Sequence, residues 1–277
     1  MKKAPAANED APQRIAKVLA RVGLCSRRDA ERWIAQGRVA VDGAVLTSPA
    51  VTVTAQSDIR VDGMPLPEPE RTRLWRYHKP AGLVTTHRDE KGRPTVFSAL
   101  PEGLPRLVSV GRLDLNSEGL LLLTNDGALA RRLELPATGW TRRYKVRVHG
   151  AVDPARLAAL GRGVAIDGVN YGPIRAGLER QQGSNAWIAL SLREGKNREV
   201  RRVLEHLGYP VTRLIRLAYG PFQLGHLPRG AIEEVPRKVL QDQLGGGSSA
   251  PLRPGPKPGR RRVAKIGSRQ THSRERL

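Results

Sequence analysis

The 277-residue sequence contains one cysteine, few aromatic residues and far fewer acids than bases. Cys25 has no partner for an internal disulfide, and a single thiol cannot build a cysteine-rich metal site. No stretch approaches the ~18 consecutive apolar residues that a membrane-spanning helix needs. The two lysines at the N-terminus are not followed by the apolar segment of a secretory signal. These absences predict a soluble, cytoplasmic protein without a membrane partner.

Positive charge is the strongest feature of the composition. Lys and Arg number 48 against 26 Asp and Glu, which gives a net charge of +22, and 38 of those cations are arginines. Hydrophobic residues make up 39%, enough for a folded core. Because a guanidinium binds phosphate through two parallel N–H groups and stacks on bases, the composition favours a nucleic-acid partner over a membrane surface.

Composition and charge divide the chain into four parts. We expect an N-terminal module at residues 12–63, a stiff linker with three prolines at residues 64–72, and the main domain at residues 73–244. Residues 245–277 hold nine cations and one acid among many Gly, Pro and Ser. This composition predicts a disordered basic tail that contacts phosphate without base specificity, with an inert solubilising tail as the alternative.

The N-terminal module is expected to contain two helices and a small sheet. Apolar residues recur at helical spacing over residues 15–22. Ser26, with Asp29 three residues later, predicts the N-cap of a second helix that ends at Gly37. Short strands follow at residues 38–41, 44–46 and 59–61, the first two joined by the turn pair Asp42-Gly43.

Basic side chains gather on and beside these two helices, namely Lys17, Arg21, Arg27, Arg28 and Arg38. Two of them open the second helix, where free backbone N–H groups also favour a phosphate, although ordinary solvated charges are the alternative. The segment RIAKVLARVGLCSRRDAERWIAQGRVAVDGAVL resembles the S4 (αL-like) RNA-binding domain. The resemblance implies binding to structured RNA through shape and backbone contacts.

Several chemistries lack their residues in the main domain. No G-x-G-x-x-G follows an expected strand, and no G-x-x-x-x-G-K-S/T loop is present. The six histidines are scattered, and the Cys and His ligands of a zinc deaminase are absent. An enzyme acting on RNA would therefore have to work with carboxylates, tyrosine, lysine and arginine.

Asp114 is the first candidate catalytic residue. It lies in the segment LVSVGRLDLNSEGLLLLTNDG, between an expected strand that ends at Gly111 and the apolar run 120–123. A carboxylate in such a loop is either a structural cap or a catalytic group. Glu118 is the other carboxylate nearby, but the sequence does not place it opposite Asp114, as a glycosidase pair would require.

Tyr144 lies on a strand expected at residues 140–148, WTRRYKVRV, in which basic and apolar residues alternate. A tyrosine among basic residues can stack on an extruded base, worth ~1–3 kcal/mol. The alternative is a half-buried core tyrosine.

A third segment, LREGKNREVRRVLEHLG, is expected to turn from a strand into a helix at Gly195. The helix carries Arg198, Arg201 and Arg202. Most of these charges should face solvent or phosphate, but one could pair with Asp114.

Together these segments resemble the RsuA-type branch of the pseudouridine synthases. The matching stretches are HKPAG at 78–82, GRLD at 111–114 with GLLLLTNDG at 119–127, RYKV at 143–146, and GKNREVRR at 195–202. Ser117 stands where the family usually has threonine, and both keep a hydroxyl group. The resemblance spans residues 12–242 with the S4 module. It implies an α+β fold with a mainly antiparallel mixed sheet and a central cleft. The sequence pattern agrees with this fold, because the expected strands alternate with helices at about 126–133, 154–160, 198–207 and 237–244.

The resemblance assigns the nucleophile to Asp114, base stacking to Tyr144 and the role of carboxylate partner to Arg201. A charged partner suits a carboxylate that must stay ionised in a closed pocket. Further RNA contacts are expected at Arg112, Lys196, Arg198 and Arg202. No cofactor and no metal are implied.

The implied reaction is isomerisation of one uridine to pseudouridine in rRNA. The most similar members act on 23S rRNA of the large subunit, and the partner is free rRNA or an assembling ribosomal particle bound by a monomer. Two alternatives remain open, a non-catalytic S4-type rRNA-binding or ribosome-assembly factor, and the same chemistry on 16S rRNA. A base-excising or ribonucleolytic enzyme is disfavoured because no second catalytic carboxylate or histidine pair can be assigned.

Overall fold

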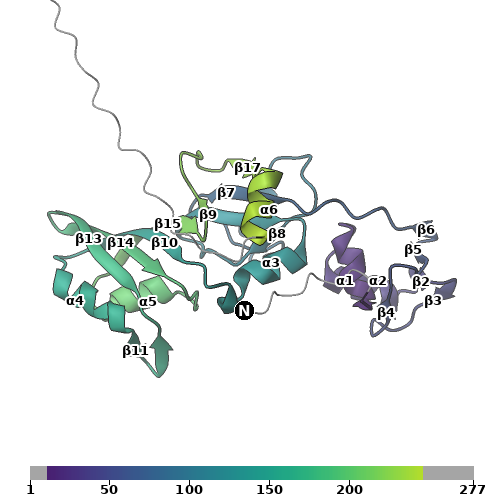
Figure 1. Ribbon diagram of the computed structural model, residues 1–277, viewed down its shortest axis with the longest axis horizontal. Coiled ribbons are helices and arrows are strands. Elements are labelled where there is room, and N and C mark those ends of the chain that lie inside the picture. Colours follow the sequence, from purple (N-terminus) through teal and green to yellow (C-terminus); the bar gives the residue numbers. More distant parts are fainter. Residues whose placement is uncertain (1–10, 246–277) are drawn as a thin grey trace, which may run out of the picture.

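The computed structural model describes residues 11–245 (Figure 1). An N-terminal module lies at one end of the molecule and contains two helices with a four-stranded sheet and a two-stranded ribbon. Its elements are α1 (Ile15–Arg21), α2 (Arg27–Ala35), the sheet β3-β2-β5-β6 (Ala44–Val45, Val39–Val41, Ile59–Val61, Met64–Pro65), and the ribbon of β1 (Gln13–Arg14) with β4 (Thr52–Val53). The tail expected at residues 245–277 lies outside the described residues, except for its first residue.

Local sequence signals account for the module. Ser26 accepts a hydrogen bond from the backbone N–H of Asp29, whose carboxylate accepts one from the Ser26 N–H, so the predicted capping box is present. Asp42 and Gly43 both have positive φ, as the tight hairpin turn requires. The helices and strands enclose a separate small core around Ile15, Leu19 and Ile34, joined by Ala30, Val39 and Val53.

The main domain is built on one nine-stranded sheet with the order β13-β14-β10-β15-β9-β7-β17, in which β16 also pairs with β15 and β8 with β9. All strand pairs are antiparallel except β15 with β9, so the predicted mainly antiparallel mixed sheet is confirmed. The strands are β7 (Leu74–Lys79), β8 (Val108–Val110), β9 (Ser117–Thr124), β10 (Arg142–His149), β13 (Arg175–Gln182), β14 (Asn185–Leu192), β15 (Val211–Tyr219), β16 (Phe222–Gln223) and β17 (Ile232–Glu234). A separate hairpin pairs β11 (Val164–Ile166) with β12 (Val169–Tyr171).

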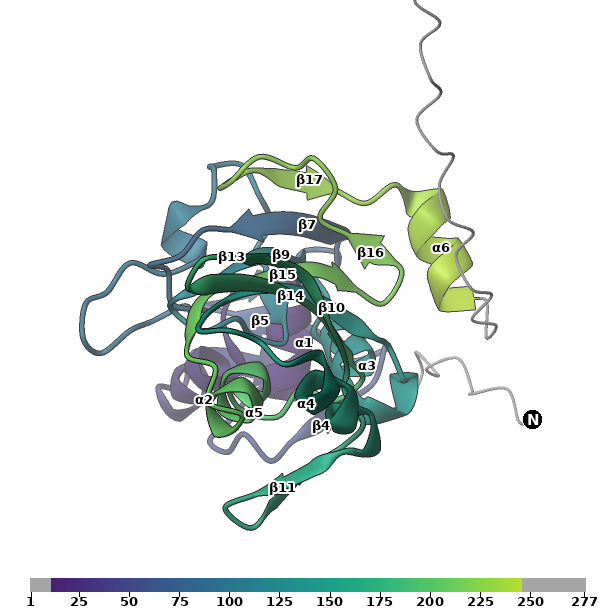
Figure 2. The same cartoon turned by 90° about the vertical axis from the view of Figure 1, so that its left-hand side faces the viewer.

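Four helices complete the domain at the positions that the sequence predicts. They are α3 (Gly127–Glu134), α4 (Pro154–Ala159), α5 (Glu199–His206) and α6 (Arg237–Gly245), with short 3₁₀ turns at Phe97–Ala99, Pro136–Thr138 and Leu160–Arg162. Helices α4 and α5 lie on the same side of strands β13, β14 and β10 (Figure 2). Their apolar residues pack onto the inward-facing residues of those strands. Among residues 11–245, no helix lies on the opposite side of these strands (Figure 1, Figure 2).

Strand β10 follows the predicted alternation along its whole length. Tyr144, Val146 and Val148 are buried on the helix side, while Arg143 and Arg147 are exposed on the other. This two-residue period follows from the pleat, which points successive side chains to opposite faces. Arg142 is the one basic residue of this strand that the structure buries.

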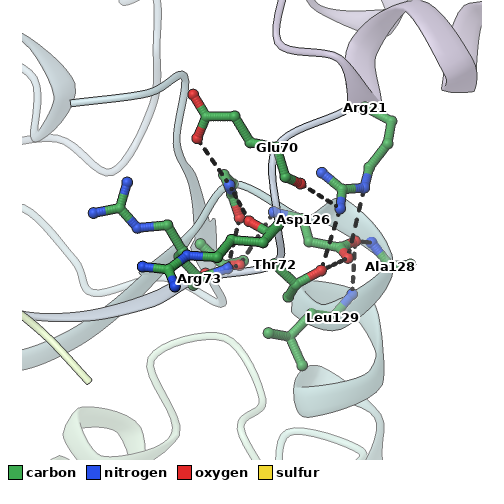
Figure 3. A network of polar contacts seen from close by, with 10 residues as sticks. Arg21, Glu70, Thr72, Arg73, Asp126, Ala128 and Leu129 are labelled. Carbon is green, nitrogen blue, oxygen red and sulfur yellow. Dashed lines mark hydrogen bonds and ion pairs between the residues drawn. The ribbon is translucent and has the colours of Figure 1, made fainter. Parts of the chain in front are cut away.

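A polar network joins the N-terminal module to the main domain (Figure 3). The Arg21 guanidinium, from the end of α1, donates to the Glu70 carbonyl at 3.0 Å and to the Thr72 hydroxyl at 3.2 Å. It also lies 3.7 Å from the Asp126 carboxylate. Asp126 caps the start of α3 and accepts a hydrogen bond from Thr72 at 2.7 Å. One arginine of the module therefore contacts both the linker and a helix end of the main domain.

Within residues 11–245, none of the helices combines the length and apolar content that a bilayer crossing demands.

Candidate active site

The main cavity, of about 660 Å³, opens on the side of the sheet that carries α5. Its wall comes from the loop between β8 and β9, the starts of β10 and α5, and the middle of β15. Seven cationic side chains and three carboxylates line it, namely Arg112, Arg131, Arg142, Lys196, Arg198, Arg201 and Arg216, with Asp114, Glu134 and Glu199. A wall of this charge attracts a polyanion.

Asp114 lies on the loop that connects β8 to β9, at the edge of the sheet. Its side chain is 32% exposed, and its carboxylate lies 3.8 Å from the Arg198 guanidinium. Arg198 precedes α5 with a left-handed backbone, at φ 51°, and lines the same cavity. The structure therefore places the predicted nucleophile in the cavity wall, beside a cation and accessible from solvent.

Tyr144 and Arg201 line the same cavity as Asp114. Tyr144 is 9% exposed and packs in the core between β10 and the helices. The same side chain also forms part of the cavity wall. Both readings of this tyrosine are thus compatible with its position. All three candidate residues therefore line one cavity, and their catalytic roles stay predictions.

The expected pairing of Arg201 with Asp114 differs from what the structure shows. Among the ion pairs of residues 11–245, Asp114 pairs with Arg198, while Arg201 donates to the backbone carbonyls of Asn116 at 3.1 Å and Val211 at 3.2 Å. Burial lowers the pKa of Arg201, and the nearby Arg198 charge lowers it further. Arg201 therefore contacts the loop that carries Asp114 through the backbone carbonyl of Asn116.

Buried cationic side chains contact the backbone of the loop that carries Asp114. Lys79, at the end of β7, has no exposed surface, and its ammonium donates to the carbonyls of Pro80, Asp114, Leu115 and Ser117 at 2.9–3.3 Å. Charge-assisted bonds to backbone carbonyls fix position more strongly than neutral ones. The backbone at Asp114 and directly after it is therefore held by one side chain.

Arg216 and Thr85 hold the same loop at other points. Arg216, on β15, is 3% exposed and donates to the Arg112 carbonyl of this loop at 3.5 Å and to the Leu120 carbonyl within β9 at 2.7 Å. The Thr85 hydroxyl donates to the Leu113 carbonyl at 2.7 Å. Lys79, Arg201 and Arg216 have no carboxylate within ion-pair distance in the described part of the chain, so their charge acts on the loop and the cavity.

The sequence does not identify Lys79 and Arg216 as the residues that hold the Asp114 loop. Lys79 was noticed only as part of the HKPAG segment. Arg216 occupies a position on β15 whose neighbours along the same face, Leu214 and Ala218, are buried and apolar. An arginine at a core-facing position of a strand is a signal that could have been read.

Four polar atoms in the cavity wall are buried without a hydrogen-bond partner among the described residues. They are Ser117 Oγ, Glu199 Oε1, Arg201 Nε and Arg216 Nη2. Leaving such groups unpaired costs roughly 1–3 kcal/mol each, so they are rare in folded proteins. Burial also raises the pKa of Glu199. These unpaired groups belong to residues of the cavity wall, and the atoms themselves are shielded from solvent.

Glu118 is not a second catalytic carboxylate opposite Asp114. Its carboxylate binds the guanidinium groups of Arg213 at 2.8 Å and Arg229 at 3.1 Å, and it does not line the cavity. The hydrogen bond from Arg213 holds the pKa of Glu118 below its usual value. No group of three or more His, Cys, Asp or Glu in residues 11–245 is arranged to hold a metal ion.

The other predicted RNA-binding residues fall into two groups. Arg27, Arg28, Arg112 and Arg202 are exposed, and Lys17 is half-buried. Arg38 and Lys196 are engaged within the protein, since Arg38 pairs with Asp62 and stacks on Trp33, and Lys196 pairs with Glu194 at 2.7 Å. Asp62 lies 24 residues from Arg38 in the chain, so the sequence does not mark that pair, whereas Glu194 is only two residues from Lys196.

Comparison with known proteins identifies the family. A family model described as RNA pseudouridylate synthase matches residues 73–206, and an S4 domain model matches residues 13–59. An uncharacterized RNA pseudouridine synthase of Rickettsia felis is 48% identical over 229 residues, which cover 83% of this chain and 99% of that protein. The chain belongs to the RNA pseudouridine synthase family. It is therefore an RNA-directed isomerase, and the expected fold and family are confirmed.

Other relatives have more specific names. Ribosomal large subunit pseudouridine synthase B of Yersinia pestis is 43% identical over 234 residues, covering 82% of this chain and 74% of that protein. The protein of the same name from Pasteurella multocida is 46% identical over 232 residues, covering 80% and 67%. A crystal structure of a pseudouridylate synthase superposes with a TM-score of 0.58 at 27% identity, covering 83% of this chain and 99% of that one.

Proposed function

We propose that this pseudouridine synthase isomerises one uridine of large-subunit (23S) rRNA, with Asp114 as the nucleophile. The observation that carries the proposal is the position of Asp114, on a rigidly held loop in a cationic cavity that Tyr144 and Arg201 also line. Relatives at 43–46% identity bear the name of large-subunit pseudouridine synthases, which supports the choice of rRNA.

The reaction breaks the C1′–N1 bond of uridine, turns the uracil and joins C1′ to C5. The C5 proton is lost and N1 gains one, so the reaction is neither redox nor net hydrolysis. Asp114 either adds to the uracil ring or attacks the sugar carbon, and a carboxylate suits both routes. The uridine must leave its base stack to reach the cavity, which costs a few kcal/mol and less in a loop or bulge.

The neighbouring residues have distinct proposed roles. Tyr144 stacks on the uracil and assists removal of the C5 proton. Arg198 supplies the cation nearest to the Asp114 carboxylate, and Arg201 holds the Asn116 carbonyl of the same loop. A preorganised loop of this kind keeps the nucleophile at its attacking position and lowers the cost of reaching the transition state.

RNA binding is shared between the two domains in this proposal. The N-terminal module, proposed at residues 12–63, contacts rRNA phosphates through Arg27 and Arg28, with Lys17 beside them. Arg112 and Arg202 contact the RNA around the flipped nucleotide. The protein would act as a monomer in the cytoplasm, on free rRNA or on an assembling particle.

The decisive experiment replaces Asp114 with asparagine. Asp114→Asn keeps the size and shape of the side chain but removes its nucleophilic charge, so uridine isomerisation on large-subunit rRNA should fall below detection. Affinity for the rRNA should stay within a few-fold of the wild type. Asp167→Asn is a matched control, because Asp167 lies exposed in the β11–β12 turn and its positive φ suits asparagine.

Three outcomes would contradict parts of the proposal. Isomerisation retained by Asp114→Asn would reject Asp114 as the nucleophile. A wild-type protein that binds rRNA without forming pseudouridine would favour a non-catalytic binding or assembly factor. Pseudouridine formed in 16S rRNA and absent from 23S rRNA would move the substrate to the small subunit.

A further inference from the structure

The face of the sheet opposite the cavity carries a second concentration of positive charge. On strands β13, β14 and β10, the residues that face away from α4 and α5 are exposed or half-exposed. The two views agree that both helices lie on the other side of these strands (Figure 1, Figure 2). We call this surface the outer face; its residues are Arg143, Lys145, Arg147, Arg175, Gly177, Arg180, Trp187, Ala189 and Ser191.

Strand register places the outer-face cations in rows. Arg180 on β13 and Arg147 on β10 flank Trp187 on β14, and Arg213 on β15 continues the row beyond Arg147. Arg175 and Arg143 flank Ser191 in a second row. Adjacent strands are ~4.8 Å apart and alternate residues along a strand ~7 Å apart, so these guanidinium groups form a grid on the sheet.

Little negative charge opposes this grid. Glu179 is the one acid on the three strands within the described chain, and it pairs with Lys145 at 3.0 Å. On the neighbouring β15, Arg213 is already paired with Glu118 at 2.8 Å. The Lys145 ammonium also lies 5.2 Å from the centre of the Trp187 ring. Arg143, Arg147 and Arg180 are left without a carboxylate within ion-pair distance among residues 11–245.

The outer face is separate from the active site. On β10, Arg142 and Tyr144 point to the cavity, while Arg143 and Lys145 point away from it. A ligand on the outer face therefore has the whole thickness of the sheet between itself and Asp114. Contacts there can strengthen binding but do not touch the reacting base.

We propose that the outer face binds the phosphate backbone of a second segment of the same rRNA. Unpaired arginines on the sheet suit a backbone, because each guanidinium can bind a phosphate in a two-pronged geometry without reading a base. Residues 246–277 carry nine cations and one acid, so the same charge sign disfavours them as the occupant. The choice of rRNA as the partner rests on the proposed function. The new element is that the main domain contacts RNA on both faces of its sheet.

The test neutralises three cations of the grid that lie outside the active site. The triple variant Arg143→Gln, Arg147→Gln, Arg180→Gln should bind a full-length 23S rRNA transcript roughly tenfold more weakly, with the salt slope of log Kd reduced by about 2–3. KM on that transcript should rise while kcat is unchanged. On a short hairpin carrying only the modified uridine and its stem, both kcat and KM should match the wild type.

A second triple variant provides the control for bulk charge. Arg162→Gln, Arg237→Gln, Lys238→Gln removes three exposed cations elsewhere on the same domain, and it should bind the transcript much more tightly than the outer-face variant. If both triple variants weakened RNA binding equally, the loss of net charge alone would explain the effect, and the proposal would be overturned. An unchanged transcript affinity and salt slope would also overturn it.

The two proposals fail in distinguishable ways. A wild-type protein without isomerase activity on either RNA would contradict the proposed function, yet the affinity and salt slope of the outer-face variant would still be measurable. Full activity of the outer-face variant on both RNAs, with wild-type affinity, would contradict the outer-face proposal alone.

Discussion

At the scale of single residues, Lys79 is the buried charge with the most direct hold on the Asp114 loop. Its ammonium has four carbonyl partners and no exposed surface. Burial lowers its pKa to about 8, although the nearby Asp114 and Glu118 carboxylates oppose the shift. A neutral amine has only two N–H groups for four carbonyls, so loss of the proton should loosen the loop.

We therefore expect kcat to fall as the pH rises through about 8. Folding lowers the pKa of Lys79, so the unfolded chain keeps this proton to a higher pH, and the contribution of the group to folding stability rises between about 8 and 10.5. The activity loss should thus occur without a lower Tm. Single-turnover rates and Tm, both measured from pH 6.5 to 9.5, check this prediction.

The variant Lys79→Met separates this group from others that titrate in the same range. It should be slower than the wild type at pH 7 and should lack the decline near pH 8. A decline of the same size and midpoint in Lys79→Met would show that another group, in the protein or in the RNA, causes it.

At the scale of elements, the parallel contact between β9 and β15 brings the Asp114 loop beside Arg216. Gly119 lies at this contact with φ 102°, and a Cβ there would be 2.3 Å from the Arg216 carbonyl oxygen and 2.7 Å from its nitrogen. Only glycine fits both the backbone conformation and the close approach.

Gly119→Ala should lower the free energy of unfolding by more than ~1 kcal/mol, because it strains the backbone and separates the two strands. Urea denaturation followed by circular dichroism measures the change. Gly177→Ala on β13 is the control, since a Cβ there meets nothing within 4 Å, and its effect should stay within about 0.5 kcal/mol. Equal stability of the two variants would mean that the strand contact relaxes around a methyl group.

At the scale of the whole molecule, Arg21 forms a polar junction between the N-terminal module and the rest of the chain. Arg21 connects α1 to the linker residues Glu70 and Thr72 and to Asp126 at the start of α3 (Figure 3). A module fixed by such a junction presents its basic residues at a defined distance from the cavity, which reduces the ordering cost of RNA binding.

Arg21→Ala should therefore raise KM for rRNA several-fold while kcat stays near the wild-type value. Cleavage by a protease within residues 66–72 should also become faster, because the linker loses its contact. Arg32→Ala is the control, since Arg32 pairs only with Asp29 inside the module, and it should leave protease cleavage unchanged. A fall in kcat with unchanged KM for Arg21→Ala would instead assign the junction to the chemical step.

Local features of the fold could be predicted from the sequence because short-range physics decides them. The Ser26 capping box, the Asp42-Gly43 turn and the alternation of β10 depend on residues within a few positions of each other. Asp114 and Tyr144 were also identified as candidates, since one ends up in a loop after a strand and the other on a strand with basic neighbours. Their roles in catalysis remain proposals.

What the sequence alone determined was the local structure, the family and the cationic character of the molecule. The folded chain was needed to show that Arg198 faces Asp114, that Lys79 and Arg216 hold its loop, and that Arg142 of β10 lines the cavity. Lys79 and Arg216 bond across more than thirty residues of chain to backbone carbonyls. Every residue has such a carbonyl, so no residue type marks the acceptor, and only the folded sheet brings donor and acceptor together.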